Sequence, residues 1–140
     1  MYIYISSDQS GSYFQGNSPG SFRVKLPRQL QLTPQGSWNV AILDINLPKP
    51  PADYKPAYLT INSSMCQPSI VNGTQAPVLH KIYYSQFKNG KPLTFDNPRY
   101  VPVITDSLDI IEIYLTDSNG ALPSFQKGHS ACTLHLVKAD

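Results

Sequence analysis

The chain has 140 residues, a length that fits one domain and leaves no room for a second. Only 14% of its residues are charged and 41% are hydrophobic, a composition typical of a compact fold and not of a disordered chain. Its 11 lysines and arginines are scattered along the sequence and give a net charge of only +2. We therefore expect no specific binding to nucleic acid.

The residue types that favour or break helices indicate the fold class. The 9 acidic residues include a single glutamate, Glu112, whereas glutamate is common on exposed helix faces. The 13 prolines and 8 glycines supply turns, and the 9 tyrosines suit the surface of a pleated sheet. The sequence therefore predicts an all-β protein without helices.

Signals for membranes and for secretion are not found. No apolar run approaches the roughly 18 residues of a membrane-spanning helix, and residues 1–11 lack the basic and apolar regions of a signal peptide. For a protein that is not secreted, we expect Cys66 and Cys132 to be free, buried thiols, although a disulfide between them stays open. The glycosylation sequons at Asn62 and Asn72 are interpreted as chance, because they matter only in a secretory lumen.

In chain order, the pattern predicts strands at residues 2–6, 22–26, 38–47, 58–62, 78–84, 100–103, 109–115 and 131–137. In the second strand, period-two alternation directs Arg23 and Lys25 toward solvent. Pro27 should end this strand, because it has no amide hydrogen for the ladder. Residues 38–47 form the longest apolar run and predict a central strand that is buried on both faces.

The segments between the predicted strands also contain residues that indicate their structure. Residues 48–56 contain four prolines and predict an extended surface connection. Asn89 and Gly90 suit a hairpin bend, and Pro102 places its strand at a sheet edge or bulge. In the last two strands, we expect six residues to point inward: Ile111, Ile113, Leu115, Cys132, Leu134 and Leu136. About eight antiparallel strands predict one domain over residues 1–140, a two-sheet sandwich or jelly roll.

The sequence offers no pattern for catalysis by a thiol or a metal. Cys132 and His135 are three residues apart on a predicted strand, so their side chains point to opposite faces, into the core and to solvent. Cys66 is expected to pack within a loop. The three histidines lack the spacing of metal ligands. We predict that the protein is not an enzyme and binds no cofactor or metal.

A pair of aspartates for glycoside hydrolysis stays open, because a fold can bring distant carboxylates together. Asp106 and Asp117, however, each lie in a Thr-Asp-Ser triplet at a predicted strand end, and Asp109 lies near the first triplet. An aspartate in such a position commonly caps its own backbone. We therefore predict that these aspartates stabilise turns.

The tyrosines are more numerous than a core of this size requires. Tyr83 and Tyr84 are adjacent in a predicted strand, so one of them should lie at the surface. Tyrosine is enriched at protein interfaces, because its ring buries area while its hydroxyl keeps a hydrogen-bond partner. Two interpretations stay open, a binding surface and a tyrosine-rich surface without a partner.

Two stretches of the sequence contain motifs in addition to the alternation that predicts strands. Residues 22–48 contain a strand ending in Leu-Pro, a short polar link and then Gly-x-Trp-x-Val-Ala. Residues 97–138 contain Tyr-Val-Pro-Val, Asp-x-Ile-x-Ile, Asp-Ser-Asn-Gly, Pro-Ser-Phe-x-x-Gly and a closing Leu-His-Leu. Together they resemble the penton-like minor capsid proteins of Polintons (Mavericks), adintoviruses and adomaviruses, with looser agreement at residues 75–81.

This resemblance implies a single jelly roll that forms pentamers in the capsid of an icosahedral double-stranded DNA virus or Polinton-like element. Its partners would be further copies of itself and a double-jelly-roll major capsid protein. The protein would assemble inside the host cell and reside in the virion. The sequence has no long insertion and no Arg-Gly-Asp, so a host-receptor role is not expected.

Subunits of a ring need two complementary patches on each chain. Aromatic and proline content selects the candidate interface residues Tyr2, Tyr4, Tyr13, Phe14, Pro50 and Tyr54. The alternative function is a monomeric ligand-binding sandwich, such as a carbohydrate-binding module with tyrosine platforms. Trp38 lies within the most apolar segment, so it is expected in the core and not as a sugar platform, which counts against this alternative.

Overall fold

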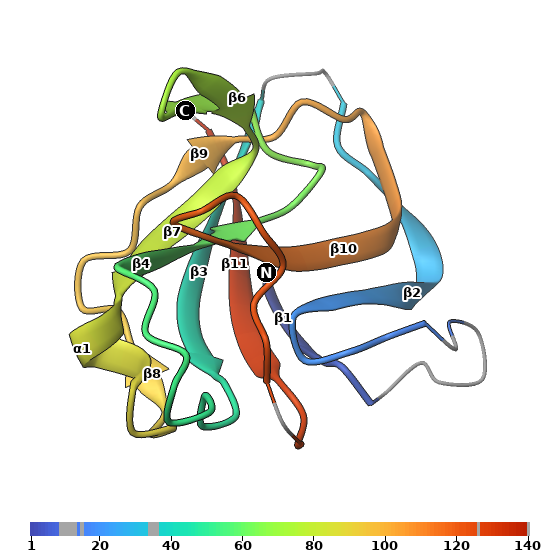
Figure 1. Cartoon of the computed structure of the whole chain (residues 1–140). Helices are drawn as coiled ribbons and strands as arrows, with labels where there is room; N and C mark the ends of the chain where they lie inside the picture. The colour runs from blue at the N-terminus through green and yellow to red at the C-terminus, as the bar shows by residue number, and fades with distance from the viewer. Residues whose placement is uncertain (9–13, 15, 34–36, 126, 140) are drawn as a thin grey trace.

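Figure 1 shows the computed structural model, which describes residues 1–8, 14, 16–33, 37–125 and 127–139. Its strands are β1 (Tyr2–Ser6), β2 (Ser21–Gln31), β3 (Trp38–Asn46), β4 (Tyr58–Asn62), β5 (Ser69–Val71), β6 (Thr74–Ala76), β7 (Val78–Tyr83), β8 (Leu93–Thr94), β9 (Val101–Pro102), β10 (Ser107–Asp117) and β11 (Ala131–Lys138). A single short helix, α1 (Tyr84–Phe87), is found in the described part of the chain. The predicted all-β class is confirmed.

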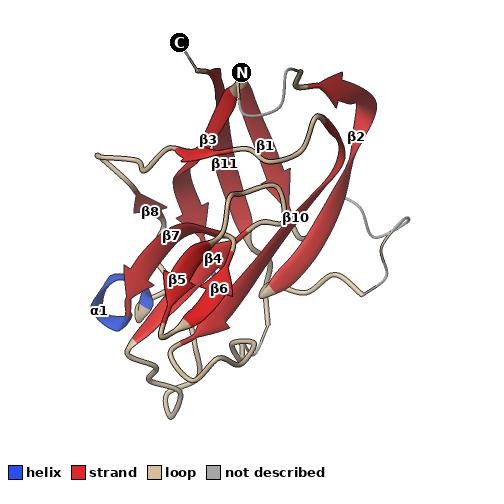
Figure 2. Cartoon of the chain, turned by 90° about the horizontal axis from the view of Figure 1, so that it is seen from above, coloured by secondary structure: helices blue, strands red, loops and turns tan. Residues whose placement is uncertain are grey.

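The strands form two main antiparallel sheets, as in a β-sandwich. Sheet A has the order β1-β11-β3-β8, with β9 also paired to β3. Sheet B has the order β2-β10-β4-β7. Figure 2 shows the two layers, with β1, β11 and β3 in one and β10, β4 and β7 in the other. The hairpin of β5 and β6 is a separate two-stranded ribbon.

The apolar core lies between the two sheets. Alternation along β10 buries Ile111, Ile113 and Leu115 almost completely, and Ile110 on the same strand is exposed. All six residues expected to point inward are buried. In β3, Ala41 is as buried as its neighbours Val40 and Ile42, so this strand is covered on both faces as predicted. Trp38 packs against the core and is half-buried.

Pro27 does not end its strand, contrary to our expectation. Strand β2 continues to Gln31, although the pairing with β10 is interrupted between Lys25 and Leu30, which oppose Ile110 and Leu108. The absent amide hydrogen of Pro27 falls within this irregular stretch of an edge strand. Proline is tolerated there because few ladder hydrogen bonds are lost.

The prediction that the chain contains no helix is wrong at one place, the end of β7. The strand stops at Tyr83, whose amide donates a hydrogen bond of 2.8 Å to the side-chain oxygen of Gln86, and α1 begins at Tyr84. Phe87 from this turn is buried in the core. The packing of one aromatic ring therefore outweighs the strand pattern.

The hairpin expected at Asn89 and Gly90 is also wrong. Gly90 follows α1 in a left-handed conformation (φ 65°), and its amide donates to the carbonyl of Phe87. The flanking strands β7 and β8 belong to different sheets. A tight hairpin occurs instead at Asn72 and Gly73, which join β5 to β6 with φ values of 49° and 77°.

The proline-rich connection, residues 48–56, contains no strand or helix, as predicted. It is not entirely on the surface, because Pro50 and Pro56 are buried. Tyr54 from this segment reaches the turn after β10. The connection therefore packs against the sandwich along part of its length.

The core placement gives a first prediction. Ile113→Ala removes a fully buried side chain and should lower the free energy of unfolding by about 2–5 kcal/mol. Ile110→Ala, on the same strand at a residue that is 43% exposed, should cost less than about 1 kcal/mol. Urea unfolding measures both variants. Equal losses would contradict the assignment of the two faces of β10.

Candidate functional site

Two of the six predicted interface residues lie together on an open surface. Tyr2 and Tyr4 belong to β1, the edge strand of sheet A, and 56% and 70% of their surfaces are exposed. They lie on one face of the strand because strand side chains alternate. Ile3 and Ile5, which alternate with the two tyrosines along β1, face the core.

The other four predicted interface residues are not brought into one patch. Phe14 is half-buried, and Tyr13 lies outside the described residues. Pro50 is buried in the monomer, so its side chain offers little surface to another chain. Tyr54 is half-buried and donates a 2.7 Å hydrogen bond to Asp117 at the end of β10.

The structure adds two residues that sequence reasoning did not select. His135 lies opposite Tyr2 in the β1–β11 register, and their rings stack with centroids 4.4 Å apart. The Tyr100 hydroxyl lies 2.7 Å from Nδ1 of His135. We call Tyr2, Tyr4, Tyr100 and His135 the tyrosine surface. His135 was expected to face solvent, but it is half-buried among these rings.

The two edge strands β1 and β2 differ in their charged residues. Strand β1 contains no charged residue, whereas β2 carries Arg23, Lys25 and Arg28. Arg23 lies 2.9 Å from Glu112 and Lys25 lies 3.2 Å from Asp109, both across the ladder to β10. Lysine, arginine and proline at a sheet edge discourage pairing with another chain, and β1 lacks all three.

The surroundings of the two cysteine thiols do not favour a nucleophilic role. Cys66 and Cys132 are free and buried, as predicted. Burial raises the pKa of each thiol to about 12, and the nearby Asp44 adds to this effect at Cys132. The thiolate, the reactive form, is therefore scarce at neutral pH.

Asp117 stabilises the turn after β10, as the Thr-Asp-Ser pattern predicts. Its Oδ1 accepts hydrogen bonds from the amides of Asn119 and Ala121, and its Oδ2 accepts one from Tyr54. Burial alone would raise the pKa of Asp117, but these hydrogen bonds outweigh it and hold the pKa below the usual 3.8. Asp109, by contrast, lies inside β10 and pairs with Lys25.

Both sequons can be placed in the fold. Asn62 is fully buried on β4, so its amide is not accessible in the folded chain. Asn72 is exposed, but its Nδ2 donates a 2.7 Å hydrogen bond to the Tyr58 hydroxyl. The Asn72–Tyr58 contact fastens the β5–β6 hairpin to β4. The Asn-Gly pair was a usable signal for this hairpin, which sequence reasoning missed.

The remaining chemistry and the comparisons identify no family. No group of three or more histidine, cysteine or acidic side chains that could hold a metal ion is found among the described residues. The one helix in this part of the chain is too short to span a membrane. The sequence matches no protein-family model, and no curated protein is significantly similar to it.

The buried thiols give a second prediction. At pH 8, Cys66 and Cys132 of the native protein should react with a disulfide reagent at least about a hundredfold more slowly than the same thiols in urea, because a thiol of pKa about 12 is rarely ionised. Absorbance of the released thiolate measures both rates. Rapid reaction of one native thiol would contradict its burial.

A third prediction concerns the Tyr54–Asp117 hydrogen bond. Tyr54→Phe should lower the free energy of unfolding by about 1–2 kcal/mol at pH 7, where the acceptor is a carboxylate. A lowered pKa stabilises the fold above pH 3.8 and loses that contribution as pH falls through the folded value. The difference between wild type and variant should therefore shrink below about pH 4.

Urea unfolding at several pH values measures this difference. Tyr83→Phe is the matched control, since Tyr83 is an exposed tyrosine at the end of β7. A control variant as destabilised as Tyr54→Phe would show that the hydrogen bond to Asp117 is not responsible.

Proposed function

We propose that the chain is a jelly-roll subunit of an icosahedral viral capsid, placed at the vertices as a pentamer or at another minor capsid position. The observation that carries the proposal is the strand order. Sheet A is β1-β11-β3-β8 and sheet B is β2-β10-β4-β7. A jelly roll is two Greek keys folded into two such sheets, and it is common in viral capsid proteins.

The path of the chain supports this topology. The first and last strands, β1 and β11, pair in sheet A, and β2 pairs with the penultimate strand β10 in sheet B. Next inward, β3 pairs with β11, and β4 pairs with β10. Each early strand thus lies beside a late one, as in a long hairpin rolled up into a sandwich. Small strands β8 and β9 together complete the edge of sheet A next to β3.

The resemblance to penton-like minor capsid proteins falls on structurally central strands. Residues 22–48 contain most of β2 and all of β3, and residues 97–138 contain β9, β10 and β11. These segments supply the inner strands β10, β11 and β3 of both sheets. The likeness therefore concerns mainly the framework of the sandwich, together with the turn and loop that follow β10.

The tyrosine surface is the proposed contact between copies. It combines exposed tyrosine rings with an edge strand, β1, that has no charge or proline. Such an edge accepts another chain more readily than the charged edge at β2. In a closed ring, this surface on one copy meets a different patch on the next, over an area on the order of 1,600 Å².

The proposed partners are further copies of the chain and a double-jelly-roll major capsid protein, in a virion assembled inside the host cell. The alternative is a monomeric ligand-binding sandwich, because lectins share the jelly roll with capsid proteins. A fold does not choose between these functions. The oligomeric state distinguishes the capsid subunit from the monomeric ligand-binding protein.

The fourth prediction tests assembly by light scattering across a concentration series. The wild type should reach a mass near five times 15.5 kDa. Tyr2→Ser combined with Tyr4→Ser should shift the series toward the monomer, because both rings leave the proposed contact. Tyr83→Ser, which removes an equally exposed ring on β7, should leave the pentamer intact.

A wild type that stays monomeric up to its solubility limit would contradict self-assembly and favour the ligand-binding alternative. A pentamer that is unaffected by the double substitution would place the contact elsewhere. Circular dichroism of each variant checks that the sandwich is still folded.

A further inference from the structure

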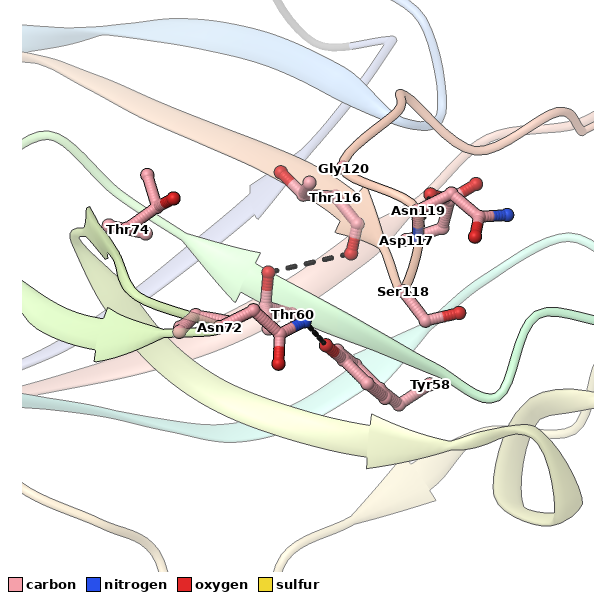
Figure 3. Close-up of a pocket in the computed structure, with 11 residues that line it drawn as sticks. Tyr58, Thr60, Asn72, Thr74, Thr116, Asp117, Ser118, Asn119 and Gly120 are labelled. Carbon is pink, nitrogen blue, oxygen red and sulfur yellow. Dashed lines mark hydrogen bonds between the residues drawn. The ribbon is translucent and has the colours of Figure 1, made fainter.

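A cavity of about 350 Å³ opens on the outer face of sheet B. Its floor is formed by β4 and the end of β10, and its two sides are the β5–β6 hairpin and the turn after β10. Figure 3 shows Asn72 and Thr74 of the hairpin on one side, Ser118 and Asn119 of the turn on the other. The volume lies within the usual range for small-ligand sites, although at its lower end.

The floor of the cavity is a fixed network of polar groups. The buried Asn62 Nδ2 lies 3.2 Å from the hydroxyl oxygens of Thr60 and Thr116, and its two hydrogens are shared with the carbonyls of Thr60 and Tyr114 at 3.3 and 3.2 Å. The Thr60 hydroxyl in turn donates to the carbonyl of Thr116. The Thr116 hydroxyl oxygen is one of the acceptors near Asn62, and no acceptor for the hydroxyl hydrogen is found among the described residues. This hydrogen is available to a ligand.

Both sides of the cavity are held in place. The hairpin is fastened to the floor by the hydrogen bond between Asn72 and Tyr58. The opposite turn is held by the three hydrogen bonds that Asp117 accepts. A site whose sides are fixed before binding loses little entropy when a ligand enters.

The cavity presents several side chains whose hydrogen-bonding groups are not fully used within the described part of the chain. Thr74 and Asn119 make no side-chain hydrogen bond in the described part of the chain. Ser118 Oγ accepts from the amide of Ala57, so its hydroxyl hydrogen is also available. Tyr58 and Val71 add apolar surface. Hydroxyls and amides that converge beside an aromatic ring match a ligand with many hydroxyls and an apolar ring face.

The charged residues near the cavity limit the class of ligand that it can bind. Among the described residues that line this cavity, Asp117 is the only charged one, and none is a lysine or an arginine. Lys81 and Arg99 line an adjoining cavity, which shares Tyr58, Thr60, Val71 and Asn72 with this one, and Lys81 Nζ lies 4.3 Å from the centre of the Tyr58 ring. A carboxylate beside the ligand disfavours anions. The larger cavity is therefore suited to a neutral molecule.

We propose that this cavity binds a neutral sugar, such as the terminal hexose or N-acetylhexosamine of a glycan. The Thr116, Thr74 and Ser118 hydroxyls and the Asn119 amide hold the sugar hydroxyls, and Tyr58 and Val71 contact its carbon atoms. This site is on sheet B, away from the tyrosine surface of sheet A. It does not depend on the assembly state, and a capsid subunit with such a site would display it for contact with glycans.

The fifth prediction tests the site with four methyl glycosides, those of glucose, galactose, mannose and N-acetylglucosamine. Saturation-transfer NMR observes the ligand, so it works for a monomer and for a pentamer. At least one glycoside should receive saturation, and titration should give its Kd. Thr74→Val and Asn119→Ala, on opposite sides of the cavity, should each weaken binding about tenfold through one lost hydrogen bond.

Thr94→Val is the matched control, because Thr94 is an exposed strand threonine on sheet A. It should bind as the wild type does. The proposal is overturned if none of the four glycosides binds, or if both cavity variants bind as well as the control. It is also overturned if the methyl glycoside of N-acetylneuraminic acid, an acidic sugar, binds more tightly than every neutral one.

Discussion

The packing of two apolar sheet faces against each other is the constraint on which the rest of this structure depends. Alternation along each strand sends one set of side chains inward, and Ile113 of β10 and Leu134 of β11 are completely buried as a result. A one-residue slip of either strand would turn its whole apolar set toward solvent. The register of β2 against β10 shifts near Pro27, at the edge of sheet B, and Leu108 beyond the shift is still buried.

Once the inner faces are committed to the core, the two outer surfaces are free to differ. Sheet A ends in β1, where Tyr2 stacks on His135 and no charged side chain guards the edge. Sheet B carries the ion pair of Arg23 with Glu112 and is partly covered by the β5–β6 hairpin. This difference fits the proposed contact between copies on one surface, while the other surface holds the polar cavity.

The acidic residues and thiols that could have taken part in catalysis have structural roles in the fold. The single glutamate is used in a cross-strand ion pair, and Asp117 organises a turn. Both cysteines are buried, and their pKa values are raised. In the proposed sugar cavity, the side chains that keep unused hydrogen-bonding capacity, such as Thr74 and Asn119, are neutral. The accessible surface of the described residues therefore offers recognition by hydrogen bonds and aromatic rings.

The sequence by itself determined the all-β class, most strand positions, the inward residues of β10 and β11, and the turn role of Asp117, because these depend on local alternation and turn chemistry. Only the tertiary structure decided the helix at Phe87, whose ring fills a gap in the core. It also decided the tyrosine surface, because Tyr100 and His135 are 35 residues apart in sequence. The cavity likewise joins segments that meet only when β4 and β10 pair, a contact that local pattern does not encode.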